Sequence, residues 1–387
     1  TRQVSAGAAQ DGAGNGNVAS NLASVTYDSV GPTCVVTGPA SPTSNAPIVF
    51  TLTFSEPVTG LTATGIDVTN STKGALSGSG NTYMLPVAPS GEGAVTCQVQ
   101  AASAQDAAGN GSLESNLLSV SFDSVPPTCV ATGPASPTNN APIVFTLTFS
   151  EPVTGLTAAG IDVTNGAKGV LNGGDIGYLI TVTPVDQGPV ACRVLGNAAQ
   201  DAAGNGNLES NLAAVSFDSV PPTCVVTGPA SPTDNTPIVF TLSFSEPVTG
   251  LTATAINVTN GTKDILSGSD NTYTLPVTPL SEGAVTCQVQ AASAQDAAGN
   301  GNLESNLLSV TYDSTEEGEL ALTAPNGGEA WGCGTTHTIT WQNTSGDAGP
   351  EVRLALHKAG DFVDWIVRQT ENDGTNNWIV WTGIDPA

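Results

Sequence analysis

Acidic side chains recur along this 387-residue chain in sets of the same type, and each set follows the last after 95 residues. Each set contains three carboxylates and one amide: Asp28, Glu56, Asp106 and Asn110; Asp123, Glu151, Asp201 and Asn205; Asp218, Glu246, Asp296 and Asn300. Carboxylate and amide oxygens, together with carbonyl oxygens from a Gly-rich loop, are the ligands that Ca²⁺ takes in groups of six to eight. We therefore predict that these residues are calcium ligands, if the fold brings each set together.

A second interpretation of the same residues is turn formation. Asp and Asn hydrogen-bond to their own backbone in loops, and the D-A-A-G-N segment would form a tight turn without a metal. A cation is favoured because no Lys or Arg in these motifs neutralises the carboxylates, which repel one another when gathered. Asp67 and Asp162 are weaker candidates, because the third copy has Asn257 in their place. Glu92 is weaker too, because the second copy has Gln187.

The elements that must position these residues also repeat every 95 residues. The string TGPASPT begins at Thr37, Thr132 and Thr227, and composition changes after Asp313, beyond which all five Trp and both His lie. The predicted domains are a C-terminal remnant of a repeat at 1–28, three full repeats at 29–123, 124–218 and 219–313, a linker at 314–318 and a different module at 319–387.

Within one repeat, apolar and polar residues alternate with a period of two, which predicts half-buried strands. About seven such strands, separated by Pro, Gly and Asn turns, fit an immunoglobulin-like sandwich. The predicted fold class is therefore all-β, with tandem immunoglobulin-like β-sandwiches arranged as beads on a string. In this topology the entering linker and the loops after the second and sixth strands lie at one end, so they should gather Asp28, Glu56 and Asp106.

Two cysteines occur in each full repeat, 63 residues apart, on positions that share the parity of core residues. The natural interpretation is three intradomain disulfides, Cys34–Cys97, Cys129–Cys192 and Cys224–Cys287, each worth about 4 kcal/mol in the chain-entropy model. Such bridges imply an oxidising compartment. The alternative is buried free thiols in a reducing cell. Metal binding by cysteine is disfavoured, because the sequence has no C-x-x-C spacing.

Composition excludes several classes of function. With 34 acidic and 8 basic residues the net charge is −26, which excludes a nucleic-acid binder that works through a basic face and disfavours anionic membrane surfaces. No apolar stretch is long enough for a transmembrane helix. Residues 1–313 contain no His, so a Ser–His–Asp or Cys–His arrangement is impossible there, and we predict no enzymatic activity. The five Trp of the last module form either a small core, which we favour, or a carbohydrate platform.

The repeats resemble a known family in the segments FSEPVTGLTATGIDVTN, TYTLPVTP and QDAAGNGN, the last of which is followed by a YDS linker. These segments are similar to bacterial Ig-like domains, which occur in tandem in large surface adhesins and other secreted proteins. The resemblance covers residues 1–313 and implies an extracellular or cell-surface array of β-sandwiches. Many such arrays are stiffened by calcium, which agrees with the calcium prediction from the carboxylates.

The final module resembles a second family. LTAPNGGEAWGCGTTHTITW, VRLALHKAG and NDGTNNWIVW look like the β-sandwich domain of the Kre9/Knh1 fungal wall proteins, which bacterial secreted proteins carry as an accessory module. Such a domain normally continues for another strand or two, so we expect both ends of the chain to be truncated. The partner of Cys333 would then lie in the continuation.

These observations predict a non-catalytic fragment of a large extracellular protein that acts as a rigid stalk or adhesin spacer. Its partners would be a surface receptor, a glycan or copies of itself, with no nucleic acid and no membrane span in this segment. One alternative is a self-assembling extracellular fibre or surface-layer subunit, in which strand addition completes residues 1–28. The other is an accessory segment of a secreted polysaccharide-active enzyme.

Overall fold

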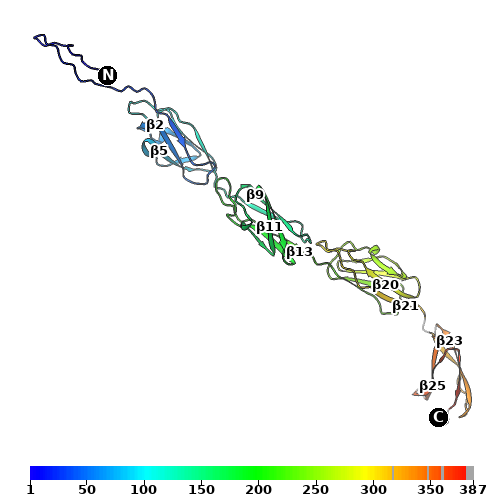
Figure 1. Ribbon diagram of the computed structural model, residues 1–387. Helices are drawn as coiled ribbons and strands as arrows, with labels where there is room; N and C mark the ends of the chain where they lie inside the picture. The colour runs from blue at the N-terminus through cyan, green and yellow to red at the C-terminus, as the bar shows by residue number, and fades with distance from the viewer. Residues whose placement is uncertain (316–317, 347, 359–360, 381–387) are drawn as a thin grey trace. The chain divides into compact units, whose positions relative to one another are not determined.

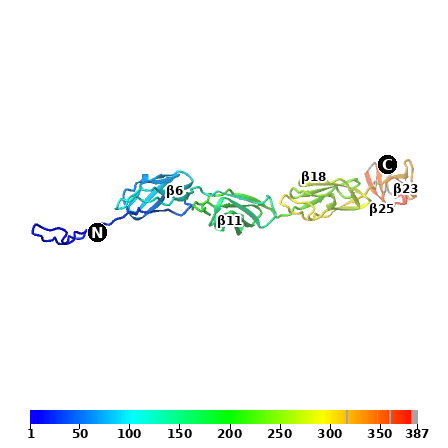
Figure 2. The same ribbon diagram turned by 90° about the horizontal axis from the view of Figure 1, so that it is seen from above.

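The computed structural model describes residues 1–315, 318–346, 348–358 and 361–380 and divides the chain into two compact units, Thr1–Asp218 and Ser219–Ala387. Figures 1 and 2 show that the strands of each repeat form a body of their own. In the described ranges, the helices are three short 3₁₀ turns: η1 (Ala63–Gly65), η2 (Ala158–Gly160) and η3 (Ala253–Ala255). None of them is long or apolar enough to cross a membrane.

The first full repeat folds into two antiparallel sheets. One sheet has the order β1-β2-β5-β4 and the other β3-β6-β7. Their strands are β1 (Cys34–Thr37), β2 (Ile48–Val58), β3 (Ile66–Thr69), β4 (Ser71–Lys73), β5 (Ser77–Pro89), β6 (Gly93–Val99) and β7 (Leu118–Phe122). The all-β sandwich prediction is thus confirmed, and this repeat has seven strands, the predicted number.

The next two repeats have the same pairing. In the second, the sheets are β11-β9-β8 and β10-β12-β13, and in the third they are β14-β15-β19-β17, with β18 beside β19, and β16-β20-β21. The second repeat contains β8 (Cys129–Thr132), β9 (Ile143–Val153), β10 (Ile161–Thr164), β11 (Gly166–Pro184), β12 (Gly188–Val194) and β13 (Ala213–Phe217). The third contains β14 (Cys224–Thr227), β15 (Ile238–Phe244), β16 (Ile256–Thr259), β17 (Gly261–Lys263), β18 (Ser267–Ser269), β19 (Thr272–Pro279), β20 (Gly283–Val289) and β21 (Leu308–Tyr312).

Each core lies between the two sheets of its repeat because alternate side chains of every long strand point inward. Along β2 the burial alternates between buried Phe50 and Leu52 and the more exposed Val49 and Thr51. The opposing sheet contributes buried residues such as Val95 from β6. A sandwich of this size therefore depends on a few fully buried apolar side chains, each worth about 1.5–3 kcal/mol.

Residues 1–28 keep a piece of this architecture without a covering sheet. Arg2 pairs with Ala23, and their amide and carbonyl groups exchange hydrogen bonds of 2.8 and 2.9 Å. The equivalent pair in the first full repeat is Cys97 and Leu118, so the hairpin has the same register. Figure 1 shows this hairpin at the N-terminus. Apolar side chains of residues 1–28, for example that of Tyr27, are exposed.

The final module consists of β22 (Glu319–Ala324), β23 (Thr336–Ser345) and β26 (Thr375–Ile379) in one sheet and β24 (Glu351–Lys358) with β25 (Asp361–Glu371) in another. Buried Ile339, Trp341 and Val352 form its small core, and Trp331 and Trp378 pack against them. Trp331 also stacks on the ring of His337 with centroids 4.3 Å apart. Three of the five tryptophans therefore contribute to the core, as the favoured interpretation predicts for them, whereas Trp381 lies outside the described residues.

The structure does not support the three predicted disulfides. Cys34, Cys97, Cys129, Cys192, Cys224 and Cys287 are free thiols. All six are buried, so the prediction from strand parity that they face the core is correct. A free thiol packs as a small hydrophobic group, and it does so here between the apolar side chains of the two sheets. Burial raises the pKa of Cys97 to about 12, and the neighbouring Cys34 adds to this rise.

We expect the core to respond very differently to two adjacent substitutions in β5. Leu85 is fully buried, whereas Met84 is about half exposed. Leu85→Ala should lower the free energy of unfolding of the first full repeat by about 2–5 kcal/mol, because it leaves a cavity. Met84→Ala, the matched control, should change it by less than about 0.5 kcal/mol. Denaturant unfolding of the full chain measures both, and equal effects would contradict the predicted inward face of β5.

The burial of the six thiols predicts their reactivity. At pH 8 iodoacetamide should modify the exposed Cys333 in the folded protein and spare the buried cysteines, because only the thiolate reacts and burial disfavours it. In guanidinium without reductant, mass spectrometry should find all seven modified. Six cysteines that react only after reduction would mean that they form disulfides in solution.

Candidate metal centre

The fold brings the predicted carboxylates of the first set together. Oxygen atoms of Asp28, Glu56 and Asp106 lie within 4.8 Å of one another. Asp28 precedes β1, Glu56 is in the last part of β2, and Asp106 is in the loop between β6 and β7. Asp106 is buried, Glu56 is half-buried and Asp28 is exposed. Residues that are up to 78 positions apart in the sequence thus form one group at the end where the chain enters the sandwich.

The second set has the same arrangement. Asp123, Glu151 and Asp201 also have carboxylate oxygens within 4.8 Å of one another, with Asp201 buried and the other two half-buried. The same residue types recur at Asp218, Glu246 and Asp296. Two oxygens bound to one Ca²⁺ at 2.3–2.6 Å are at most roughly 5 Å apart. One cation can therefore contact all three carboxylates of such a group.

The loop between β6 and β7 is ordered by hydrogen bonds around Asp106. One oxygen of this carboxylate accepts the amides of Ala108 and Asn110 at 2.8 and 2.9 Å. The other accepts Nδ2 of Asn110 at 2.8 Å. These bonds, led by that of the Asn110 side chain, lower the pKa of Asp106. Gly109 completes the turn at φ +88°, a conformation that favours glycine.

The structure gives Asn110 and its equivalents a different role from the predicted one. Nδ2 of Asn110 also donates to the carbonyl of Asp28 at 3.2 Å, and Nδ2 of Asn205 donates to the carbonyl of Asp123 at 2.9 Å. Both neighbours of the amide are acceptors, so its NH₂ group and not its oxygen faces the carboxylates. Asn205 and Asn300 donate in the same way to Asp201 and Asp296. The asparagines therefore hold the loop and the linker, and the three carboxylates are the better ligand candidates.

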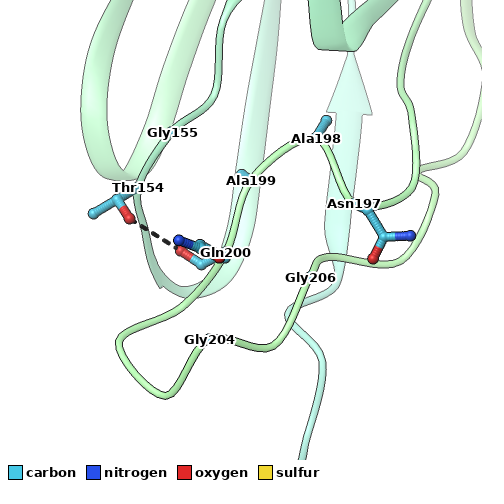
Figure 3. Close-up of a pocket in the computed structure, with 8 residues that line it drawn as sticks. All are labelled: Thr154, Gly155, Asn197, Ala198, Ala199, Gln200, Gly204 and Gly206. Carbon is cyan, nitrogen blue, oxygen red and sulfur yellow. Dashed lines mark hydrogen bonds between the residues drawn. The ribbon is translucent and has the colours of Figure 1, made fainter.

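A short β-bridge joins the loop that contains the buried aspartate to the end of the strand that contains the glutamate. In the second full repeat Thr154 and Gln200 exchange backbone hydrogen bonds of 2.8 and 3.0 Å, and Figure 3 shows the Thr154 hydroxyl directed at Gln200. The first repeat has the same bridge between Thr59 and Gln105. Because Thr154 follows Glu151 by three residues and Gln200 precedes Asp201, this bridge holds both carboxylates at one end of the sandwich.

A surface hollow of about 320 Å³ lies beside this bridge (Figure 3). It is lined by Thr154, Gly155, Asn197, Ala198, Ala199, Gln200, Gly204 and Gly206. No ionisable side chain belongs to this lining, and we assign no chemistry to the hollow. The chemistry of this end of the repeat therefore lies in the carboxylate group.

The basic side chains whose ion pairs and hydrogen bonds are described bind outside the first two carboxylate groups. Arg193 forms ion pairs with Asp162 and Glu209, which lie outside the groups. The lysine of each repeat caps its 3₁₀ turn, as when Lys73 donates to the carbonyl of Ala63 at 2.8 Å. Burial, followed by the charges of Asp123 and Asp201, raises the pKa of Glu151. The arrangement thus concentrates negative charge where a divalent cation would be stabilised.

The weaker acidic candidates of the sequence are bound elsewhere. Asp67 accepts Nε2 of Gln100 at 2.6 Å, and Asp162 pairs with Arg193. Glu92 binds Ser124, the residue after the linker aspartate. One spacing in the sequence accompanies this contact: Glu92 and Glu282 each precede a linker serine by 32 residues.

The raised pKa of Glu151 predicts a pH-dependent effect of its removal. Above this pKa the ionised Glu151 destabilises the metal-free fold, and protonation relieves the repulsion as the pH falls through it. In EDTA at pH 8, Glu151→Gln should therefore raise the free energy of unfolding of the second full repeat by roughly 0.2–1 kcal/mol. At pH 4 the gain should disappear. Thermal unfolding measures both, with the exposed Glu114→Gln as the control, and a loss of stability at pH 8 would contradict the repulsion.

The chain is similar to a known family and to solved structures. The model of the bacterial Ig-like domain family matches residues 28–122, 123–216 and 218–312. Among solved structures, the chain is similar to invasin, a bacterial integrin-binding protein, with 15% identity, 91% of this chain and 74% of that chain covered, and a TM-score of 0.39. It is also similar to a tetra-tandem repeat from the extending region of a large adhesion protein, with 17% identity, 90% and 91% covered, and a TM-score of 0.27.

No curated protein matches the sequence significantly. The family match ends at residue 312, so it does not cover residues 319–387, and their resemblance to the Kre9/Knh1 domain stays a prediction. The domain boundaries from the 95-residue period also stay predictions. The matched residues nevertheless make up most of the chain, which belongs to the bacterial Ig-like domain family and carries three tandem copies of its domain.

Proposed function

We propose that this chain is a non-catalytic spacer of an extracellular or cell-surface protein, and that Ca²⁺ binds the carboxylate groups at the entry ends of the first and second full repeats. The observation that carries the proposal is the origin of the three carboxylates. One comes from the linker and two from the sandwich, and they lie within 4.8 Å of one another in both the first and the second set.

A cation in this position has a mechanical effect. Asp123 belongs to the linker between two repeats, whereas Glu151 and Asp201 belong to the sandwich that follows. An ion that binds all three carboxylates connects the linker to the end of β9 and to the loop after β12. It also removes the repulsion among the three carboxylates. The linker then loses freedom of rotation at that end, and a series of such repeats resists bending. Stiffness of this kind suits a spacer that holds a binding domain away from a surface.

The absence of histidine from the repeats and the recurrence of their carboxylates support a structural role. Residues 1–313 contain no His, and the carboxylate groups recur with the same residue types in each repeat. Repetition suits a joint, which is needed once per domain, better than an active site. Other parts of the protein would bind a surface receptor, a glycan or further copies of the chain, and the spacer would present those parts.

Calcium dependence of stability tests this proposal. At a Ca²⁺ concentration about 100 times Kd, binding stabilises a domain by about 2.7 kcal/mol. For a domain of about 95 residues this raises Tm by roughly 10–20 °C. EDTA should therefore lower the Tm of the full chain, and Ca²⁺ should restore it. Mg²⁺ should restore much less, because it requires a tighter octahedral geometry and keeps its waters.

A matched pair of variants locates the effect. Glu56→Gln should remove the calcium-dependent gain from the first full repeat and Glu151→Gln from the second, each without changing the other. Differential scanning calorimetry with and without Ca²⁺ measures the transitions. An equal Tm of the wild-type chain in EDTA and in Ca²⁺ would refute the calcium site.

A further inference from the structure

The linker aspartate of the second set is attached to both of its neighbouring repeats through its backbone. The amide of Asp123 donates to the carbonyl of Thr43 in the first full repeat at 3.0 Å. Its carbonyl accepts Nδ2 of Asn205 in the second repeat at 2.9 Å. Thr43 is buried, so the first attachment point is part of a packed sandwich. Both of these hydrogen bonds hold the backbone of Asp123 without a metal.

The residue after it is held by a carboxylate of the preceding repeat. The amide and the hydroxyl of Ser124 donate to the two carboxylate oxygens of Glu92 at 2.9 and 2.6 Å. Glu92 lies between β5 and β6, at the end of the sandwich from which the chain leaves. Two charge-assisted hydrogen bonds to one residue restrict its backbone more than one bond would. The peptide between Asp123 and Ser124 is therefore oriented from the side of the first repeat.

A third contact joins the same two repeats. Ser44, next to Thr43, donates from its amide and its hydroxyl to the carbonyl of Ala203 at 3.2 and 2.9 Å. Ala203 lies in the loop that carries Asp201 and Asn205. The first repeat thus touches both parts of the second carboxylate group: the linker that supplies Asp123 and the loop that supplies Asp201.

We propose that Glu92 is a positioning residue for the cation group of the next repeat, formed by Asp123, Glu151 and Asp201. The inference rests on the proposed function, and it adds that the preceding domain orients one ligand of this group before the ion binds. Glu92 is exposed and contacts Ser124, not the three carboxylates. It acts through the linker, as groups that orient metal ligands do, and their loss typically weakens metal binding 10–100-fold.

The third full repeat supplies a matched control. The amide and hydroxyl of Ser314 donate to the carboxylate of Glu282, as at the first junction. The preceding Asp313, however, accepts the amide of Thr315 at 3.0 Å. It belongs to none of the carboxylate groups found among the described residues. Substitution of Glu282 therefore removes the same kind of contact at a linker whose aspartate belongs to no such carboxylate group among the described residues.

Calorimetric titration with Ca²⁺ tests the proposal on the full chain. The background chain for this experiment carries Glu56→Gln and Glu246→Gln, which remove one carboxylate from the first and one from the third set. Of the three sets in the sequence, only Asp123, Glu151 and Asp201 then keep all their carboxylates. On this background Glu92→Gln should weaken Ca²⁺ binding about tenfold, and Glu282→Gln should leave it unchanged. Unchanged affinity with Glu92→Gln, or an equal loss with both variants, would overturn the positioning role.

Hydrogen exchange in EDTA separates this proposal from the calcium proposal. Because the contact between Glu92 and Ser124 needs no metal, Glu92→Gln should speed exchange of the Ser124 amide several-fold even in EDTA. The Tm of the second repeat should stay the same. If the background chain binds no Ca²⁺, the proposed function and the positioning role both fail, and faster exchange then records only the linker contact. If the chain binds Ca²⁺ and the Ser124 amide exchanges at the same rate in both proteins, the positioning role alone is wrong.

Discussion

Repulsion among three carboxylates at the entry end of the first two sandwiches is the constraint that their linkers must satisfy. The fold holds carboxylate oxygens of Asp123, Glu151 and Asp201 within 4.8 Å of one another, and burial, followed by the charges of Asp123 and Asp201, raises the pKa of Glu151. Strand pairing sets this closeness, because the loops after β9 and β12 lie at the same end of the sandwich. A metal-free repeat therefore stores unfavourable charge interactions, which a bound divalent cation would convert into attraction between the linker and the loops.

Hydrogen bonds hold these charges in place without neutralising them. The buried Asp106 is surrounded by donors from its own loop, which lower its pKa, whereas Glu151 is half-buried beside other carboxylates and its pKa is raised. The lysines do not compensate, because Lys73 and its equivalents cap the 3₁₀ turns. In the first set Asp106 is thus ordered in its charged form. In the second set Glu151 is repelled by the charges of its neighbours, which favours a cation. This division explains how a stable loop and a charged, cation-attracting end coexist in a small domain.

Several features of the site followed from the sequence and others did not. The set Asp28, Glu56 and Asp106 was predictable, because a sandwich topology places the entering linker and two loops at one end. The role of Asn110 was not, since spacing does not tell whether the oxygen or the NH₂ group of an amide faces its neighbours. Cys34 and Cys97 face the core as their parity predicted, but parity does not decide between a bond and two packed thiols, and the structure has thiols.

The sequence by itself determined the repeat of 95 residues, the principal strands of each sandwich and the residue types that gather at the entry end. These features are local or periodic: alternation along a strand depends on neighbours two residues away, and repetition makes the same fold recur. Only the tertiary structure decided how the junction is held. The contacts of Asn110 with Asp28, over 82 residues, and of Glu92 with Ser124, over 32, depend on which loops meet at the ends of the sandwiches. That meeting is set by the packing of two sheets and by the path of the linker.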